Sequence, residues 1–123
     1  MSIKVLLVDD EVSVSTPFSR LLSKDGELQV DTAECGNDAL DKIRTDSYDV
    51  VVTDMMMHNG NGDTVLNYIK MKEVLGEKAP KAIVLTGINP SESLMKEWLK
   101  KGVTKILHKP CGYKELLQVI KGI

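Results

Sequence analysis

Short apolar runs recur along the chain at intervals of ~20–30 residues, with amphipathic segments between them, as in successive strand–helix units. Runs that are apolar throughout indicate strands buried on both faces, as in a parallel sheet. The second run instead alternates apolar and polar residues, which is typical of an edge strand with one exposed side. The expected strands are Ile3 to Val8, Leu28 to Ala33, Asp49 to Thr53, Lys81 to Thr86 and Thr104 to His108.

Five amphipathic segments follow these strands, and each spaces its apolar residues as a helix does. Asn37 is expected to cap the second helix, and Gly76 to end the third. Pro17 is compatible with the first helix only if it lies in the first turn. The residues expected to face the core are Val14, Phe18, Leu21 and Leu22; Ala39, Leu40 and Ile43; Val65, Leu66, Ile69 and Met71; Leu94, Met95, Trp98 and Leu99; Tyr113, Leu116, Leu117 and Ile120.

Five strands alternating with five helices predict an α/β fold with a doubly wound parallel sheet and right-handed crossovers. The edge character of the second strand favours the strand order 2-1-3-4-5. In this order the chain reverses direction between the first and third strands. Sheets of this kind bind ligands outside the carboxyl ends of the strands at such a reversal.

Composition limits the possible functions. The 123 residues predict one domain, and the net charge of −2 gives no general attraction to nucleic acid or anionic membranes. No apolar stretch approaches the ~20 residues of a membrane helix, and the first strand begins too early for a signal peptide, so we expect a cytoplasmic protein. Cys35 and Cys111 have no CxxC spacing and should be free thiols, and His58 and His108 form no zinc pattern with them.

Chemically reactive side chains stand where the predicted strands end. Asp9 and Asp10 follow the first strand, and Asp54 follows the third. Three clustered carboxylates repel one another unless a cation or a reaction uses them. Thr86 and Lys109 end the fourth and fifth strands at the same edge, where Lys109 would supply a counter-charge. This group suits magnesium, which binds one or two carboxylates and keeps several waters.

With these residues the chain resembles, over residues 1–123, the receiver domain of two-component response regulators. The resemblance implies a flavodoxin-like three-layer sandwich in which Asp54 accepts a phosphoryl group from a phosphohistidine on a histidine kinase or phosphotransfer protein. It also implies a regulatory domain that catalyses only its own phosphorylation and dephosphorylation. The matching features are Asp9-Asp10, Asp54, Thr86, Lys109-Pro110, Gly62 eight positions after Asp54, and the run from Gly36 to Leu40.

The resemblance further implies the cofactor and the partners. Magnesium would be bound by Asp10, Asp54 and the main-chain carbonyl of Met56, with Asp9 acting through water. Besides the phosphoryl donor, the expected partner is a downstream effector protein or a C-terminal output domain, and phosphorylation could produce a homodimer. We expect no direct contact with nucleic acid and no insertion into a membrane.

The expected switch begins at the phosphoryl group. Lys109 would pair with one of its oxygens, and the Thr86 hydroxyl would donate to another. Their movement should shift the loop and helix after the fourth strand. The surface expected to report the change comprises the fourth helix, the fifth strand and the last helix, near Trp98 and Ile106.

Some residues depart from the family pattern. Ile106 stands where most receivers carry Tyr or Phe, Gly87 replaces a common Ala, and His58 replaces a common Pro. Because an Ile cannot swing a large ring, activation is expected to depend more on ordering of the loop after the fourth strand.

Met56 and Ile88 take positions that flank the attacked phosphorus in the family. Both are apolar and cannot orient water, so slow self-dephosphorylation is expected.

Three alternatives have different sequence requirements. A phosphohydrolase of the haloacid dehalogenase kind needs a second Asp two residues after the nucleophile, where this chain has Met56. A flavodoxin-like nucleotide or flavin module needs a phosphate-binding loop after the first strand, but that turn is acidic. A phosphorylation-independent interaction domain that kept the fold is the main alternative. Labelling by acetyl phosphate with magnesium, lost in Asp54→Asn, separates it from a phosphoacceptor.

Overall fold

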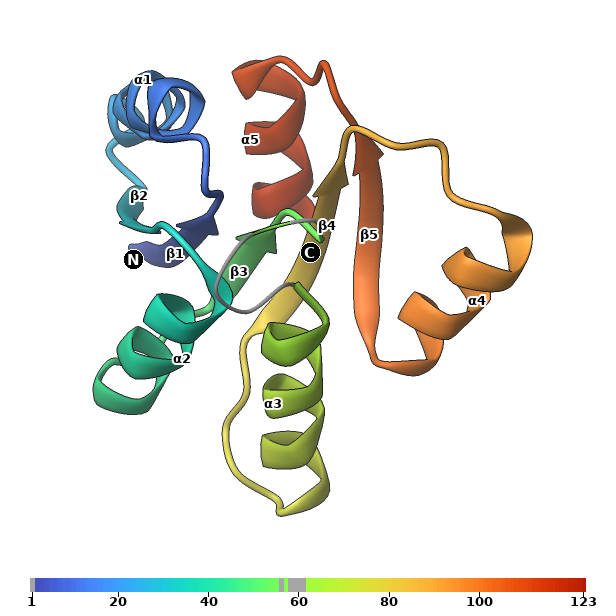
Figure 1. Cartoon of the computed structure of the whole chain (residues 1–123). Helices are drawn as coiled ribbons and strands as arrows, with labels where there is room; N and C mark the ends of the chain where they lie inside the picture. The colour runs from blue at the N-terminus through green and yellow to red at the C-terminus, as the bar shows by residue number, and fades with distance from the viewer. Residues whose placement is uncertain (1, 56, 58–61) are drawn as a thin grey trace.

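The protein is described by a computed structural model that covers residues 2–55, 57 and 62–123 (Figure 1). Strands and helices alternate along the chain, as the sequence pattern predicts. Their bounds are β1 Ile3–Val8, α1 Val12–Ser23, β2 Leu28–Ala33, α2 Gly36–Thr45, β3 Val50–Thr53, α3 Gly62–Val74, β4 Lys81–Thr86, α4 Glu92–Lys100, β5 Val103–His108 and α5 Tyr113–Gly122.

The five strands form one parallel sheet in the order β2-β1-β3-β4-β5, which confirms the predicted topology. Strands β1, β3 and β4 are central, and β2 lies at an edge with partly exposed residues along it. Two strand starts differ by one residue from prediction: β3 begins at Val50 and β5 at Val103.

Two apolar cores cover the two faces of the sheet, which gives the three layers seen in Figure 1. Because successive strand residues point to opposite faces, Leu6 and Val8 of β1 join one core, and Val5 and Leu7 join the other. Helices α2, α3 and α4 contribute to the first core, and α1 and α5 to the second. This arrangement explains the continuous apolar runs in the central strands, at residues 5–8, 50–52 and 82–85.

Two helix predictions were wrong. Pro17 lies inside α1, beyond the first turn, and its ring is exposed; it leaves the Ser13 carbonyl without the usual helical partner. Cys35, not Asn37, caps α2, since the Cys35 sulfur accepts a hydrogen bond from the main-chain N–H of Asp38 at 3.4 Å. Asn37 instead lies within the helix.

Three residues expected in the core are exposed: Met71 on α3 and Met95 and Leu99 on α4. In α4 the core positions are taken by Leu94 and Trp98, and Trp98 is only 2% exposed. Trp98 therefore lies beneath the surface on which a readout was expected. The side chain of Val14 lies outside the described part of the chain.

Gly76 follows α3 with a φ of 76°, the left-handed conformation that favours glycine, so the predicted helix end is confirmed. Cys35 and Cys111 are free thiols, as expected. None of the helices in the described part of the chain is long and apolar enough to cross a membrane.

Candidate functional site

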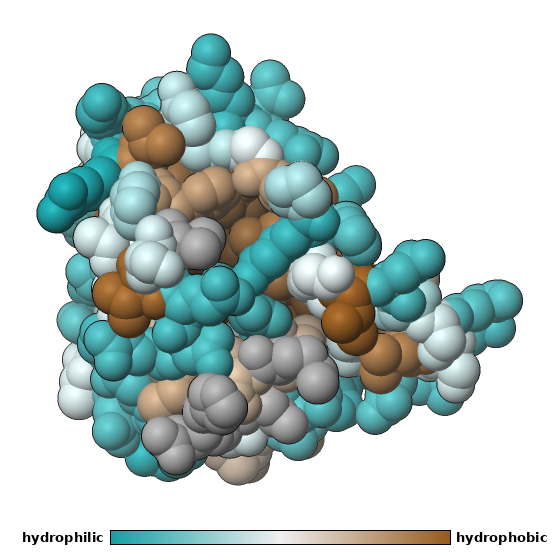
Figure 2. All heavy atoms as spheres, turned by 45° about the horizontal axis from the view of Figure 1, so that its top comes forward, coloured by the Kyte–Doolittle hydropathy of each residue, from teal (hydrophilic) through white to brown (hydrophobic). Residues whose placement is uncertain are grey.

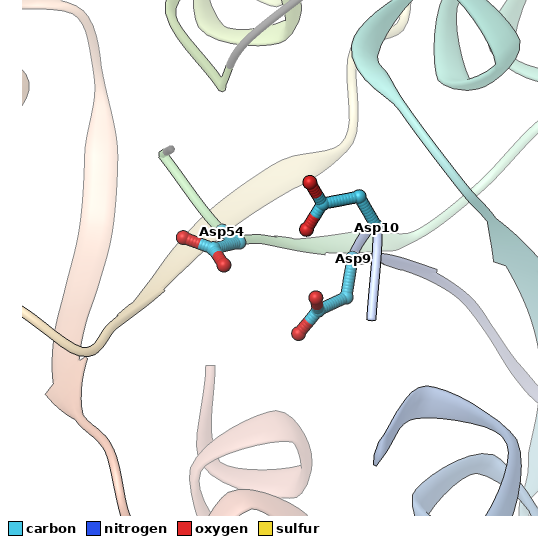
Figure 3. A group of neighbouring side chains, drawn as sticks. All are labelled: Asp9, Asp10 and Asp54. Atoms are coloured by element: carbon cyan, nitrogen blue, oxygen red, sulfur yellow. The ribbon is translucent and has the colours of Figure 1, made fainter. Parts of the chain in front are cut away.

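The three predicted aspartates meet at the carboxyl edge of the sheet. Asp9 and Asp10 follow β1 and Asp54 follows β3, and these strands pair directly, with the N–H of Asp54 donating to the Val8 carbonyl at 3.0 Å. One carboxylate oxygen from each aspartate lies within 4.8 Å of the other two (Figure 3). Asp9 and Asp54 are buried, at 5% and 9% exposed, whereas Asp10 is more open to solvent.

Lys109 reaches this cluster from the end of β5. Its Nζ donates to Asp9 Oδ2 at 2.9 Å and to Asp54 Oδ2 at 3.1 Å. Burial by itself lowers the pKa of Lys109, but the hydrogen bonds and charges of Asp9 and Asp54 outweigh it and raise the pKa above its usual value. The ammonium group therefore stays charged and offsets part of the repulsion among the carboxylates.

Thr86 ends β4, between the strands that carry Asp54 and Lys109, and is almost fully buried. Its hydroxyl oxygen accepts a hydrogen bond from the N–H of Ile88 at 3.2 Å, so it is bound to the loop after β4. The main-chain N–H of Lys109 donates to the Thr86 carbonyl at 2.7 Å, which ties the two strand ends together. Ile106 is partly buried against the core, and Ile88 is 41% exposed.

Sequence reasoning missed two contacts that fix the aspartates. The hydroxyl of Thr53, a fully buried residue, donates to the main-chain carbonyl of Asp54 at 2.8 Å. The N–H of Glu11 donates to Asp9 Oδ1 at 2.9 Å and holds that carboxylate in place. A hydroxyl directly before Asp54 in an apolar run was the available signal for the first contact. The second involves a main-chain group, which a sequence pattern does not reveal.

In the sequence, Gly62 is only a match to the family pattern. The structure gives a steric reason for a glycine at this position. A Cβ added to it would lie 2.5 Å from the Asp54 carbonyl oxygen and 2.8 Å from the Met55 Cα. Helix α3 can therefore begin this close to Asp54 only if residue 62 has no side chain. Met56 and His58 lie outside the described residues, so the metal-ligand and loop roles expected of them stay predictions.

The donor set fits a small hard cation. Three carboxylates supply only oxygen ligands, which is the preference of magnesium rather than of a thiolate- or imidazole-bound metal. In the described part of the chain the Lys109 ammonium contacts two of the three carboxylates, Asp9 and Asp54, and a divalent ion would further offset the repulsion within the cluster.

The sequence model of the response regulator receiver domain matches residues 5–121. The chain belongs to the response regulator receiver family. This receiver is 30% identical to the chemotaxis protein CheY of Treponema pallidum over 122 residues, which cover 98% of this chain and 81% of that protein. It is also 31% identical to protein-glutamate methylesterase/protein-glutamine glutaminase 1 of Methanospirillum hungatei over 119 residues, or 95% of this chain.

A solved relative carries a ligand. The Thermotoga maritima response regulator TrrA, described in complex with Mg(2+)-BeF, matches this receiver with a TM-score of 0.80 and 28% identity. The match covers 98% of this chain and 97% of that one. The receiver spans 34% of the methylesterase and 51% of the response regulator MprA of Mycolicibacterium vanbaalenii, so several relatives are much longer proteins.

Proposed function

We propose that this receiver is a phosphoacceptor switch in which Asp54 takes a phosphoryl group from a phosphohistidine on a kinase or phosphotransfer protein. The supporting observation is the contact of Lys109 with both Asp9 and Asp54 inside a cluster of three carboxylates. A carboxylate is a competent nucleophile for phosphoryl transfer, giving an aspartyl phosphate. Lys109, held beside Asp54, is placed to bind an oxygen of the incoming group.

The metal in this proposal is Mg²⁺, held by Asp10, Asp54 and the main-chain carbonyl of Met56, with Asp9 acting through water. When bound, it would draw charge from the phosphoryl oxygens during transfer. The protein's own residues contribute by holding Asp54 in position. Thr53 and Gly62 fix the main chain at Asp54 through the hydrogen bond and the close approach described above.

The switch follows from existing hydrogen bonds. A phosphoryl group on Asp54 would compete for the Lys109 ammonium, which now binds Asp9 and Asp54. It would also attract the Thr86 hydroxyl, whose oxygen now accepts from Ile88. Movement of Thr86 would pull on the loop between β4 and α4 and bias an existing equilibrium.

We propose that the readout face comprises α4, β5 and α5. Ile106 is partly exposed on β5, and Met95 and Leu99 expose apolar surface on α4. An effector protein, an output domain of the same chain or a second copy would dock there, and we further propose a cytoplasmic location. Residues 1–123 would act as one receiver domain.

Mass spectrometry of the intact protein tests the acceptor. After incubation with acetyl phosphate and Mg²⁺, we expect one added phosphoryl group, absent in Asp54→Asn and retained in Asp41→Asn. Asp41 is a suitable control because its side chain is exposed on α2 and pairs with Arg44 at 3.4 Å. Labelling of Asp54→Asn would place the acceptor on another residue, and no labelling of the wild type would favour a phosphorylation-independent interaction domain.

The lifetime of the phosphoryl group is a further prediction. Ile88, and Met56 outside the described residues, cannot orient an attacking water by hydrogen bonding. We therefore expect Met56→Asn to hydrolyse its aspartyl phosphate faster than the wild type, measured as loss of the phosphorylated mass. An unchanged or slower rate would contradict this role for position 56.

A further inference from the structure

A cavity of about 220 Å³ lies beside the aspartate cluster, between α1 and the segment joining β5 to α5. Figure 2 views the face near the carboxyl ends of the strands, which is hollowed and has an apolar floor ringed by hydrophilic side chains. Asp9 and Lys109 form part of the cavity wall. The remaining wall is largely apolar: Leu7, Phe18, Leu85 and Pro110.

Among the described residues of the wall, Ser15 is a buried polar side chain without a hydrogen-bond partner. Ser15 on α1 is only 4% exposed, yet nothing in residues 2–55, 57 and 62–123 hydrogen-bonds its hydroxyl group. The same part of the chain contains no fully enclosed side-chain oxygen or nitrogen that lacks a partner. The Ser15 oxygen is therefore not fully enclosed, and since Ser15 lines the cavity, a molecule bound there is placed to pair with it.

Cys111 closes the cavity on the side of α5 and adds no charge to it. Its sulfur lies 3.4 Å from Glu115 Oε2 and 3.6 Å from the Gly112 carbonyl oxygen. Burial, together with the nearby Glu115, raises the pKa of the Cys111 thiol to about 11, so the group is neutral at physiological pH. Apart from Asp9 and Lys109, which already pair with each other, the wall is apolar or neutral, so the cavity disfavours an ion as its main occupant.

We propose that this cavity binds a small, uncharged organic molecule, about one aromatic ring in size, that pairs one polar atom with the Ser15 hydroxyl. The volume accommodates a ring but not a helix or a strand. The cavity adjoins the proposed phosphoryl-transfer site, but its test does not require phosphorylation. Since Asp9 and Lys109 line the cavity, an occupant would still touch the ion pair of the candidate site.

Benzyl alcohol and toluene are suitable probes because they share a ring and differ in one hydroxyl group. Titrated into ¹⁵N-labelled protein, benzyl alcohol should give saturable NMR shifts at Ser15, Phe18, Lys109 and Cys111. Ser15→Ala should weaken benzyl alcohol roughly threefold to tenfold while leaving toluene unchanged, as expected for one lost hydrogen bond. Cys111→Phe should fill the cavity and abolish both sets of shifts.

Met71→Phe is the matched control, since it adds the same ring at an exposed position on α3 and should leave both affinities unchanged. Shifts that do not saturate, or that centre on other residues, would overturn the proposal. Equal weakening of both probes by Ser15→Ala would also overturn it, and this comparison stands even if Cys111→Phe does not fold.

Discussion

At the scale of single residues, Gly62 sets how closely α3 approaches Asp54. A side chain there would collide with main-chain atoms of Asp54 and Met55, which cannot move without displacing β3 or α3. We expect Gly62→Ala to destabilise the fold by about 1–3 kcal/mol, the range found for overpacking, and to slow phosphorylation of Asp54. Urea denaturation measures the first effect, and the rate of labelling by acetyl phosphate measures the second.

Gly87→Ala is the matched control for this substitution. A Cβ added at Gly87 would meet only the Lys109 Cδ, at an ordinary contact distance of 3.9 Å, and Gly87 does not have a positive φ. This variant should be neutral or more stable by about 0.4–1 kcal/mol because its unfolded chain has less freedom. Equal destabilisation of the two variants would show that crowding at Gly62 is not the cause.

The Cys111 thiol should react slowly for a partly exposed cysteine. The thiolate is the nucleophile, and with a pKa raised to about 11 the thiol is almost entirely protonated at pH 8. In a Cys35→Ala background we expect alkylation by iodoacetamide to accelerate with pH until about pH 11, and to be much faster at pH 8 in urea. A native rate that already levels off near pH 9 would contradict the raised pKa.

The residues of the site could be predicted because charged side chains stand directly after the predicted strands. Asp9, Asp10, Asp54 and Lys109 directly follow strands, so the topology alone brings them to one edge. The bond from the Thr53 hydroxyl to the Asp54 carbonyl could not be predicted in the same way. It depends on a rotamer and on local main-chain geometry, and a threonine in a buried strand is ordinary.

At the scale of elements, strands were easier to predict than helix caps and helix faces. A buried parallel strand carries a continuous apolar run, which here marks the start of β3 to within one residue. In α4, however, the pairs Leu94–Trp98 and Met95–Leu99 have the same helical spacing, and only the first pair faces the core. Spacing defines a stripe, but the neighbouring strands decide which stripe is buried.

Pro17 gives a prediction about α1. It lies in the interior of the helix with an exposed ring, so it removes a main-chain hydrogen bond and contributes little packing. Pro17→Ala should restore the bond to the Ser13 carbonyl and stabilise the protein by about 1–3 kcal/mol, after allowing for greater freedom of the unfolded chain. Arg20→Ala, also exposed on α1, should change stability by less than about 0.5 kcal/mol in the same urea titration. A destabilised Pro17→Ala would mean that the ring supports the helix in another way.

At the scale of the whole molecule, the strand order accounts for the site. Because β1 and β3 are neighbours in the order β2-β1-β3-β4-β5, two acidic strand ends from distant parts of the sequence become adjacent. The edge character of β2 favoured this order, which is one of the two common orders of doubly wound sheets, but the residues alone did not derive it. The cavity beside the site was not predictable, since its volume depends on how Phe18, Leu85 and Cys111 pack in three dimensions.

The cluster of three aspartates should also make the free energy of unfolding depend on magnesium. Folding brings Asp9, Asp10 and Asp54 together, whereas the unfolded chain separates Asp54 from the other two, so the ion should bind the folded state far more tightly. At a concentration one hundred times its dissociation constant, Mg²⁺ should add about 2.7 kcal/mol to the free energy of unfolding. Urea titrations in MgCl₂ and in EDTA measure this difference, which should largely disappear in Asp10→Asn and persist in Asp41→Asn. An equal response in all three proteins would place the effect of magnesium elsewhere, because a general salt effect does not depend on one carboxylate at the end of β1.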